Sequence, residues 1–477
     1  MPCLVYGQEC NCPASFDWMV GTFEKNDAGF QYVIDKKGKE DYEKHTAISM
    51  EKAKDAKTLE SCREVMHNWL HYFRKGHIAV NINAPVESAG VKELSAVEIR
   101  KQFENENKIK LNEKQFIAQL DKRKSRNVVE GIWTNQAYRI GIIADEKDPK
   151  KFTGFILKAD SVYWMPGQIK MELRLNADNK TFSVSYAMRD HSRQDASAEF
   201  VSESKSLLYL FNNYWVRQYP VQALEKMEEL QMRSSDTELP FIEKISGKTV
   251  YMRIPSFASE QKKQIDSVLF KYDKLITSSP NLIIDIRNGT GGSDDSYSEI
   301  IPYLYTNPMR GVGVQLYATE LNAKAFEQYA QKFEDSSSKA YCNRVAELMR
   351  KSPGKFVQYA QSTFSVDTLD TILPYPQKVG IICNHNNGST DEQFLLAAKQ
   401  SRKVKIFGHS TGGMLDISNM NYIDFPDGKF QLGYCMSKSY RIPDFCIDGV
   451  GIQPDYFIDN AIGKHEWIEY VRKVLEE

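Results

Sequence analysis

From Pro240 onward, short apolar runs alternate with amphipathic stretches, and this alternation limits the possible folds more than any other feature of the sequence. The apolar runs are, in order, KTVYMRIPSF, NLIIDIR, VGIIC and KVKIFG. They are rich in β-branched residues, which is typical of buried strands. Residues 262–278 and 390–401 instead place apolar side chains at helical spacing. Such alternation predicts an α/β domain with a mainly parallel sheet.

The rest of the chain changes its periodicity several times, and these changes indicate its organisation. Apolar residues recur at helical spacing before residue 75, whereas residues 127–200 show the alternation of strands separated by polar turns. The expected segments are a candidate export-signal remnant (1–12), an N-terminal helical subdomain (13–84), a charged helical connector (85–125), a β-rich domain (126–205), a second helical connector (206–239) and the α/β core (240–477).

Composition excludes some classes of protein. The chain has 477 residues, a formal net charge of −1 and 26% charged residues. This balance gives no reason to expect a nucleic acid or an anionic membrane as partner. No apolar run approaches the length needed to span a membrane. The composition therefore predicts a globular protein large enough for several domains.

Cysteine and histidine spacings offer little support for a metal site. The eight cysteines contain no C-x-x-C pair, which disfavours a zinc ribbon. Cys12 and Cys62 would form a disulfide if the protein is exported; the alternative is that Cys62 is a buried apolar residue of its helix. His67 and His71 have a spacing that can bind a metal. Because Asn68 replaces the glutamate of a zincin helix, a polar helix face is favoured and no metal is expected.

Ser389 stands between the predicted strand VGIIC and the helix that follows it. A hydroxyl at this position lies near free backbone N–H groups and the positive end of a helix dipole, which suits a nucleophile. Ser389 and Glu392 also fit a capping box, in which the serine only caps the helix and the glutamate supports the turn. Local sequence alone favours the cap, so the assignment depends on other motifs.

Three other turns carry residues of chemical interest. The run NGTGG (288–292) can direct its amides into a pocket, because glycine allows a carbonyl to approach the main chain closely. Ser410 lies in GHSTG, which fits the G-x-S-x-G nucleophile elbow, although no helical pattern follows it. Asp448 and Asp455 lie in a turn near the C-terminus, where an aspartate either bonds its own backbone or orients a histidine.

Four motifs, taken in order, resemble those of the C-terminal processing and tricorn-type serine peptidases of family S41, in particular tail-specific-protease-like proteins of Bacteroidetes. They are KGH (75–77), DIRNGTGG (285–292), STDEQF (389–394) and GIQPD (451–455), and the turn of residues 408–413 also fits the family pattern. The resemblance covers residues 240–477 well and the region of His77 moderately. It implies a crotonase/ClpP-like α/β catalytic core with an N-terminal helical subdomain, while the β-rich domain takes the place of a PDZ domain.

The same resemblance implies roles for individual side chains. Ser389 matches the family's nucleophile. Met414 occupies the position of the lysine in the Ser–Lys members of the family, which disfavours that version of the mechanism. The tricorn branch uses a histidine from the N-terminal region and an acid shortly before the G-x-x-P-D motif. His77 and Asp448 occupy those two positions, with aspartate in place of the usual glutamate.

Backbone N–H groups complete the expected site. The amides of Gly291 or Gly292, together with that of Thr390, are expected to bind the oxyanion, and Gly289 replaces an asparagine of the family motif. We therefore predict a serine endopeptidase that acts on peptide or protein substrates without a metal or cofactor. The alternatives are a catalytically inactive peptide-binding relative and an esterase that uses Ser410. We expect the protein to be exported to the periplasm or the extracellular space.

Overall fold

The computed structural model describes residues 10–83, 95–160, 162–211 and 213–477. The chain forms two compact units. The first contains the described residues of Met1–Glu87, Glu238–Ala461 and Val471–Glu477, and the second contains those of Ser88–Thr237 and Ile462–Tyr470. Every candidate catalytic residue belongs to the first unit.

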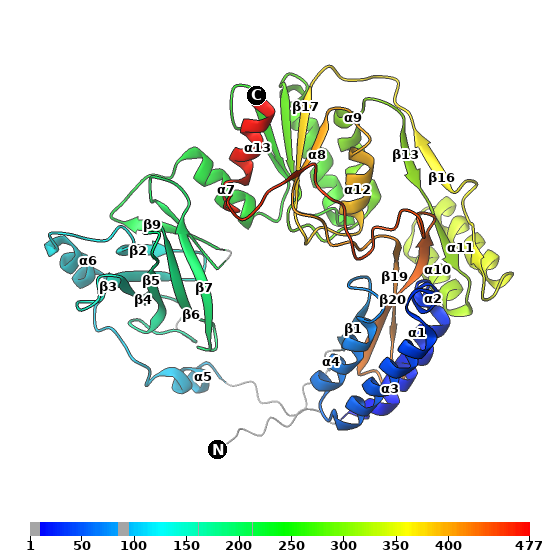
Figure 1. Cartoon of the computed structure of the whole chain (residues 1–477), viewed down its shortest axis with the longest axis horizontal. Coiled ribbons are helices and arrows are strands. Elements are labelled where there is room, and N and C mark those ends of the chain that lie inside the picture. Colours follow the sequence, from blue (N-terminus) through cyan, green and yellow to red (C-terminus); the bar gives the residue numbers. More distant parts are fainter. Residues whose placement is uncertain (1–9, 84–94, 161, 212) are drawn as a thin grey trace. The chain divides into compact units, whose positions relative to one another are not determined.

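The parallel sheet expected from the strand–helix alternation is present in the first unit (Figure 1). Its strands, in spatial order, are β10 (Phe241–Lys244), β11 (Thr249–Arg253), β12 (Asn281–Asp285), β17 (Lys378–Cys383), β18 (Val404–Gly408) and β21 (Tyr456–Phe457). Strand β10 pairs antiparallel with β11, and the other neighbours pair in parallel. The prediction of an α/β fold with a mainly parallel sheet is therefore confirmed.

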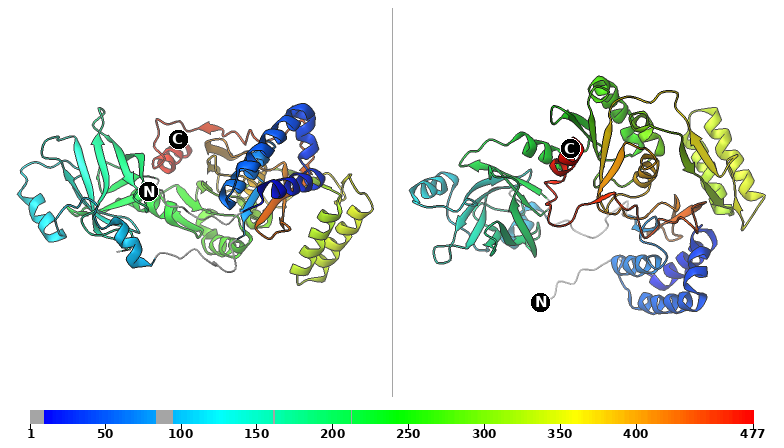
Figure 2. Two further views of the ribbon diagram at one scale, coloured as in Figure 1. Left: turned by 90° about the horizontal axis from the view of Figure 1, so that it is seen from below. Right: turned by 45° about the horizontal axis from the view of Figure 1, so that its top comes forward.

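Helices cover both faces of this sheet (Figures 1 and 2). They are α8 (Lys262–Ile276), α9 (Ile301–Leu304), α12 (Thr390–Ala398) and α13 (Trp467–Glu476), with the 3₁₀ turns η1 (Ser259–Gln261) and η2 (Asp294–Ile300). Ile381 of β17 shares one buried core with Leu269 of α8 and Phe394 of α12. On the opposite face, a Cβ at Gly380 would lie 2.7 Å from Val471, so glycine allows α13 to pack closely against β17.

A second, five-stranded sheet joins a strand from the N-terminal part of the chain to strands from its C-terminal part. It contains β1 (Ala79–Ile82), β20 (Phe430–Ser439), β14 (Val314–Tyr317), β15 (Phe356–Val357) and β19 (Ile417–Asp424). The helices before it are α1 (Cys12–Asn26), α2 (Phe30–Lys37), α3 (Lys39–Asp55) and α4 (Leu59–Leu70). Phe23 and Trp69 of these helices share a core with Leu432 of β20. Because Val80 pairs with Leu432, the segment around His77 lies beside the C-terminal strands.

The stretch between α9 and β17 carries none of the motifs described above, yet it is well structured. Besides β14 and β15, it forms the helices α10 (Glu320–Lys332) and α11 (Ser336–Arg350) and the paired strands β13 (Met309–Val312) and β16 (Phe364–Asp367). Ala323 of α10 and Val345 of α11 share a small core with Leu316 of β14. The helical pair is thereby fixed to the second sheet.

The second unit is built on a closed antiparallel barrel. Its strands are β2 (Gly131–Thr134), β3 (Arg139–Ala144), β4 (Lys151–Lys158), β5 (Ile169–Leu175), β6 (Thr181–Ala187), β7 (Arg193–Phe200), β8 (Leu207–Leu210) and β9 (Asn213–Tyr219). The accompanying helices are α5 (Ala96–Phe103), α6 (Glu113–Lys122) and α7 (Lys226–Asp236). The strands expected within residues 127–200 are therefore confirmed.

The helical pattern expected to start at Ser206 is wrong over its first half. Residues 207–219 form β8 and β9, and helix appears only with α7. Leu208 pairs with Trp215, and both are buried in the barrel core. Closing the barrel requires these last two strands, and this long-range burial outweighs the local periodicity.

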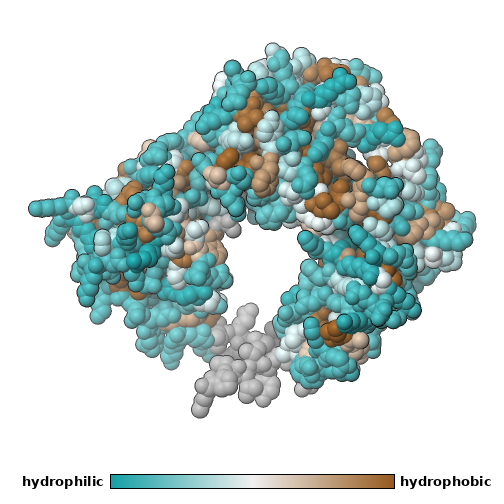
Figure 3. All heavy atoms as spheres, viewed as in Figure 1, coloured by the Kyte–Doolittle hydropathy of each residue, from teal (hydrophilic) through white to brown (hydrophobic). Residues whose placement is uncertain are grey.

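The surface is largely polar. Figure 3 shows hydrophilic residues over most of the face drawn, with apolar residues in smaller groups. Among the helices of the described residues, none is long and apolar enough to cross a membrane.

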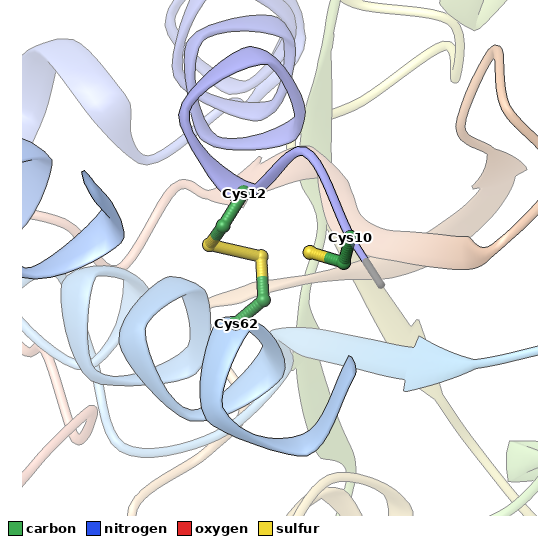
Figure 4. Close-up of side chains that lie close together, drawn as sticks. All are labelled: Cys10, Cys12 and Cys62. Carbon is green, nitrogen blue, oxygen red and sulfur yellow. A yellow bond between two sulfur atoms is a disulfide. The ribbon is translucent and has the colours of Figure 1, made fainter. Parts of the chain in front are cut away.

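Of the two alternatives for Cys62, the structure shows the disulfide with Cys12, which joins the start of α1 to α4 (Figure 4). The free thiol of Cys10 lies beside it, and the three sulfur atoms are all within 4.8 Å of one another. The candidate export-signal remnant (1–12) falls mostly on residues 1–9, which lie outside the described residues.

Removing this disulfide is expected to destabilise the first unit. Cys62→Ser opens a link across a sequence separation of 50 residues, and such links contribute about 2–4 kcal/mol to the free energy of unfolding. Urea unfolding followed by tryptophan fluorescence should give a lower midpoint for Cys62→Ser. Dithiothreitol should lower the midpoint of the wild type but not that of the variant.

The matched control is Cys10→Ser, which removes the neighbouring thiol and should keep the wild-type midpoint. Equal responses of the wild type and Cys62→Ser to dithiothreitol would contradict the predicted contribution of the disulfide.

Candidate active site

Ser389 lies at the turn between β17 and α12, with backbone angles of φ 57° and ψ −122°. A positive φ is uncommon for any residue other than glycine and marks a locally strained turn. The Ser389 amide donates a hydrogen bond to the carbonyl oxygen of Met414 at 3.0 Å, which fixes the turn from outside the helix. The side chain is half-buried and lines a cavity of about 520 Å³.

The capping-box interpretation of Ser389 is wrong, because its side chain makes no capping hydrogen bond. The carboxylate of Glu392 instead accepts from the amides of Gly413 and Met414, at 2.8 Å each, and from the hydroxyl of Thr411. Glu392 is fully buried, and burial raises its pKa. It therefore braces the turn whose Met414 carbonyl holds Ser389, and the Ser389 hydroxyl stays available to the cavity.

The glycine turn after β12 is anchored by charge. Arg287 Nη2 lies 2.6 Å from Asp285 Oδ2, and Arg253 donates to the main-chain oxygen of Asp285 at 2.9 Å. Burial alone would raise the pKa of Asp285, but Arg287 and Arg253 lower it to about 2. Asp285 and Arg287 therefore form a structural ion pair at the start of this turn.

Glycine at position 289 makes room for a buried carboxylate. A Cβ at Gly289 would lie 2.7 Å from an oxygen of Asp391, so the position has no room for the asparagine of the family motif. Asp391 accepts from the Asn387 side chain at 3.0 Å and from the Gly291 amide at 3.3 Å. Burial raises the pKa of Asp391 to about 6.

These contacts distinguish the two glycines expected to bind an oxyanion. The Gly291 amide already donates to Asp391, so Gly291 does not offer a free donor. A Cβ at Gly291 would lie 2.7 Å from that of Ser389, so its role is to let the chain pass close to the serine. An isolated parallel β-bridge joins Gly292 to Phe257. In this bridge the amide of Ser293 donates to the carbonyl oxygen of Phe257 at 2.9 Å. Gly292 itself lines the cavity together with Ser389.

Thr390 is the first residue of α12 and is almost fully buried. Amides in the first turn of a helix have no partner within the helix, so its N–H is available as a donor. Its side chain is hydrogen-bonded to Asp294, whose pKa is raised by burial and lowered in part by this bond. Of the three amides expected at an oxyanion site, that of Gly291 is the one for which the described residues show a hydrogen-bond partner, Asp391.

His77 lies between α4 and β1 with a φ of 54°. Its carbonyl oxygen accepts from Arg74 Nη2 at 2.9 Å, and Arg74 Nη1 lies 2.9 Å from Asp27 Oδ1. The buried Cys435 thiol also donates to the His77 oxygen at 3.3 Å. The main chain of His77 is thereby held by the N-terminal helices and by β20 together.

The imidazole of His77 reaches the same cavity as Ser389. Its Nδ1 lies 2.8 Å from the carbonyl oxygen of Ile417, a contact that requires the proton on Nδ1 and leaves Nε2 as an acceptor. Burial lowers the pKa of His77, so the ring is neutral at neutral pH. A neutral imidazole with a free Nε2 has the form required of a general base.

Asp448 is connected to His77 through the main chain of Ile417. Its carboxylate accepts from the amides of Leu415 at 2.7 Å, Asp416 at 2.6 Å and Ile417 at 3.0 Å. Among the ion pairs of the described residues, none joins Asp448 to His77. In place of the direct contact expected from the motif, both side chains bind the main chain of Ile417, Asp448 at its N–H and His77 at its carbonyl oxygen. The charge of Asp448 still raises the pKa of His77, opposing the larger effect of burial.

Ser410 does not meet the requirements of a nucleophile elbow. It follows β18, but the chain continues without a helix until β19. Its hydroxyl donates to the side-chain oxygen of Gln453 at 2.8 Å, and it is not among the residues that line the cavity. The esterase alternative therefore has no structural support.

His67 of α4 and His71, which caps the C-terminus of that helix, lie side by side with ring centroids 4.3 Å apart. Within the part of the chain that the structure describes, no third ligand-forming side chain joins them. Elsewhere in the described residues, Cys10, Cys12 and Cys62 form a group with metal-ligand spacing. Two of them, Cys12 and Cys62, are joined in the disulfide.

One wall of the cavity was not anticipated from the sequence. It consists of residues of α10 and α11 together with two methionines: Phe326, Tyr329, Lys332, Tyr341, Cys342, Met420 and Met436. The sequence motifs described above do not include residues 320–350, and none of them indicates that this segment faces Ser389. Their position follows from packing against β14 and the N-terminal helices.

Comparison with known proteins agrees with this architecture. Residues 248–458 match the family model described as peptidase family S41. The solved structure of mature CPAF is 11% identical, with 98% of this chain and 96% of that chain covered and a TM-score of 0.51. Mature CPAF complexed with lactacystin is 12% identical, with coverages of 98% and 97% and a TM-score of 0.50. These two show a shared fold. No curated protein matches the chain. The match to the family model is confined to residues 248–458, which contain strands β11 to β21 of the parallel sheet and Ser389.

Proposed function

We propose that this protein is a serine endopeptidase in which Ser389 is the nucleophile and His77 is the general base. The main support is that one cavity is lined by Ser389 on a strained turn, by a neutral His77 and by Gly292. These three groups come from distant parts of the sequence, and their convergence on one cavity suits acyl transfer.

The geometry suggests the following steps. Ser389 Oγ attacks the carbonyl carbon of the peptide bond while His77 Nε2 accepts its proton. The amides of Gly292 and Thr390 donate to the oxyanion, and each such donor is typically worth about 2.7–4 kcal/mol of transition-state stabilisation. His77 then passes the proton to the leaving amine. Water hydrolyses the acyl-enzyme by the same route in reverse.

In this proposal Asp448 is a positioning residue. It holds the Ile417 amide at 3.0 Å, and the Ile417 carbonyl accepts the Nδ1 proton of His77. This arrangement selects the tautomer that leaves Nε2 free. The nearby carboxylate charge also favours the imidazolium that forms during attack.

A catalytically inactive peptide-binding relative is the second candidate. It is favoured by one observation, namely that Nδ1 of His77 contacts a neutral carbonyl rather than a carboxylate. Such a partner stabilises an imidazolium less than a carboxylate does. Peptide binding in the same cavity without turnover would characterise this alternative.

We propose export to an oxidising compartment, with peptides or proteins as substrates. The support is the disulfide between Cys12 and Cys62, because such bonds persist mainly in the periplasm or outside the cell. Periplasmic and extracellular locations are equally compatible with it.

Labelling with a fluorophosphonate probe tests the nucleophile. Ser389→Ala should abolish labelling and lower peptide hydrolysis by at least ~10⁴-fold, because the attacking oxygen is removed. Ser410→Ala is the matched control and should label and turn over like the wild type. Labelling that survives Ser389→Ala but disappears in Ser410→Ala would overturn the assignment.

The pH dependence of kcat/KM tests the general base. Because burial lowers the pKa of His77 from its ordinary value of 6.5, activity should rise with pH through a pKa below 6.5 and be level at neutral pH. Asp448→Asn removes a charge that raises this pKa, so the acid limb should move to lower pH and kcat should fall by about tenfold, or ~1.4 kcal/mol.

Asp455→Asn is the control for this change, since Asp455 also accepts from a backbone amide, that of Ile406 at 2.7 Å. It should leave the position of the acid limb unchanged. If both variants keep the wild-type limb, Asp448 has only a structural role.

A further inference from the structure

The cavity that contains Ser389 and His77 extends well beyond them. Its volume of about 520 Å³ lies within the range of pockets that bury a ligand of substantial size. Beyond the serine it is lined mainly by large apolar side chains from α10, from the residue after it and from β19 and β20: Phe326, Tyr329, Phe333, Met420 and Met436. The reacting groups therefore open into an apolar space.

This apolar wall is fixed by hydrogen bonds of α10 to neighbouring elements. Tyr329 of α10 donates its hydroxyl to the carbonyl oxygen of Met420 at 3.1 Å. At the start of the same helix, the Asn322 side chain donates to the carbonyl oxygen of Asn26 at 3.0 Å, and Thr319 donates to the Asn26 side chain at 2.7 Å. Helix α10 is thus tied to both α1 and β19, so the wall is formed before a ligand binds.

The sulfur-containing residues of the wall suit more than one side-chain shape. Met420 and Met436 are flexible and polarizable, which lets them pack against either aromatic or aliphatic groups. Cys342 is buried, and burial raises the pKa of its thiol, so it remains neutral and acts as a small apolar residue.

The charged side chain that lines the cavity is cationic. Lys332, the last residue of α10, lines it with an exposed side chain, and none of the described lining residues is a carboxylate. A cation at the edge of an apolar site attracts an acidic group and disfavours a basic one.

We propose that this cavity binds a large apolar side chain, aromatic or long aliphatic, of a residue next to the scissile bond, while Lys332 attracts an acidic residue of the same substrate segment. This inference rests on the proposed peptidase function, because it places the side chain beside the bond that Ser389 attacks. It makes Lys332 and Phe333 determinants of specificity rather than catalytic residues.

The test uses the full chain and a library of peptides whose cleavage sites are identified by mass spectrometry. Phe, Tyr, Leu or Met should be enriched beside the cleaved bond, with Asp or Glu enriched nearby. Lys332→Glu should reverse the charge preference, changing the ratio of kcat/KM for matched Glu and Lys peptides by about fivefold or more. Lys339→Glu on α11 also alters an exposed lysine, which is not among the lining residues, and should leave that ratio unchanged.

A second variant examines the apolar wall. Phe333 is 45% exposed, so Phe333→Ala should fold normally, and fluorophosphonate labelling of Ser389 serves as the check. The preference for Phe over Ala beside the scissile bond should fall by about fivefold. Unchanged preferences in both Phe333→Ala and Lys332→Glu would overturn the inference.

Binding to the Ser389→Ala chain separates this inference from the proposed function. Fluorescence anisotropy should show tighter binding of Phe-containing acidic peptides than of matched Ala-containing peptides. If that difference is present but the wild type cleaves nothing, the peptidase proposal fails and the binding site stands. If the wild type cleaves peptides but the difference is absent, the catalytic proposal stands and the assignment of the cavity is wrong.

Discussion

The buried ion pair between Arg74 and Asp27 holds together the part of the structure on which the active site depends. Asp27 follows α1 and also accepts from the amide of Cys435 at 3.0 Å, while Arg74 donates to the His77 carbonyl. The pair therefore joins the N-terminal helices, the histidine loop and β20 at one point. Removing one partner of such a buried pair typically costs about 3–5 kcal/mol, because the other charge is left uncompensated. This junction acts together with the Ile417 and Cys435 contacts of His77 to fix the histidine loop.

Three carboxylates that accept from backbone amides support the turns around the site. Asp391 holds the glycine turn, Glu392 holds the turn that positions Ser389, and Asp448 holds the Ile417 peptide that orients His77. Each accepts from backbone amides, and burial raises the pKa of each. The site is thus a set of backbone loops fixed by charge, and few of its acidic side chains are free to act on a substrate. This explains why catalysis in our proposal uses a serine, a histidine and main-chain amides.

Much of the core was predictable from local pattern. The β-branched run before Ser389 and the helical spacing after it define β17 and α12, and the strand preceding NGTGG defines β12. Such elements form because their periodicity matches a sheet covered by helices. Local pattern failed where distant partners decided the outcome. Residues 207–219 form strands because they close the barrel. The Ser389–Glu392 capping box does not form, because Glu392 instead accepts hydrogen bonds from groups about twenty residues further along the chain.

The sequence by itself determined the α/β class, the turn that carries Ser389 and the glycines that approach it. These depend on residues close together in the chain, where steric limits and hydrophobic period act directly. Only the tertiary structure decided which groups meet. It brought His77 to the cavity of Ser389, assigned the Gly291 amide to Asp391, placed the Ile417 peptide between Asp448 and His77, and set an apolar wall from α10 and α11 beside the serine. The physical reason is that each of these contacts joins separate elements, whose meeting depends on how whole surfaces are buried rather than on any local pattern.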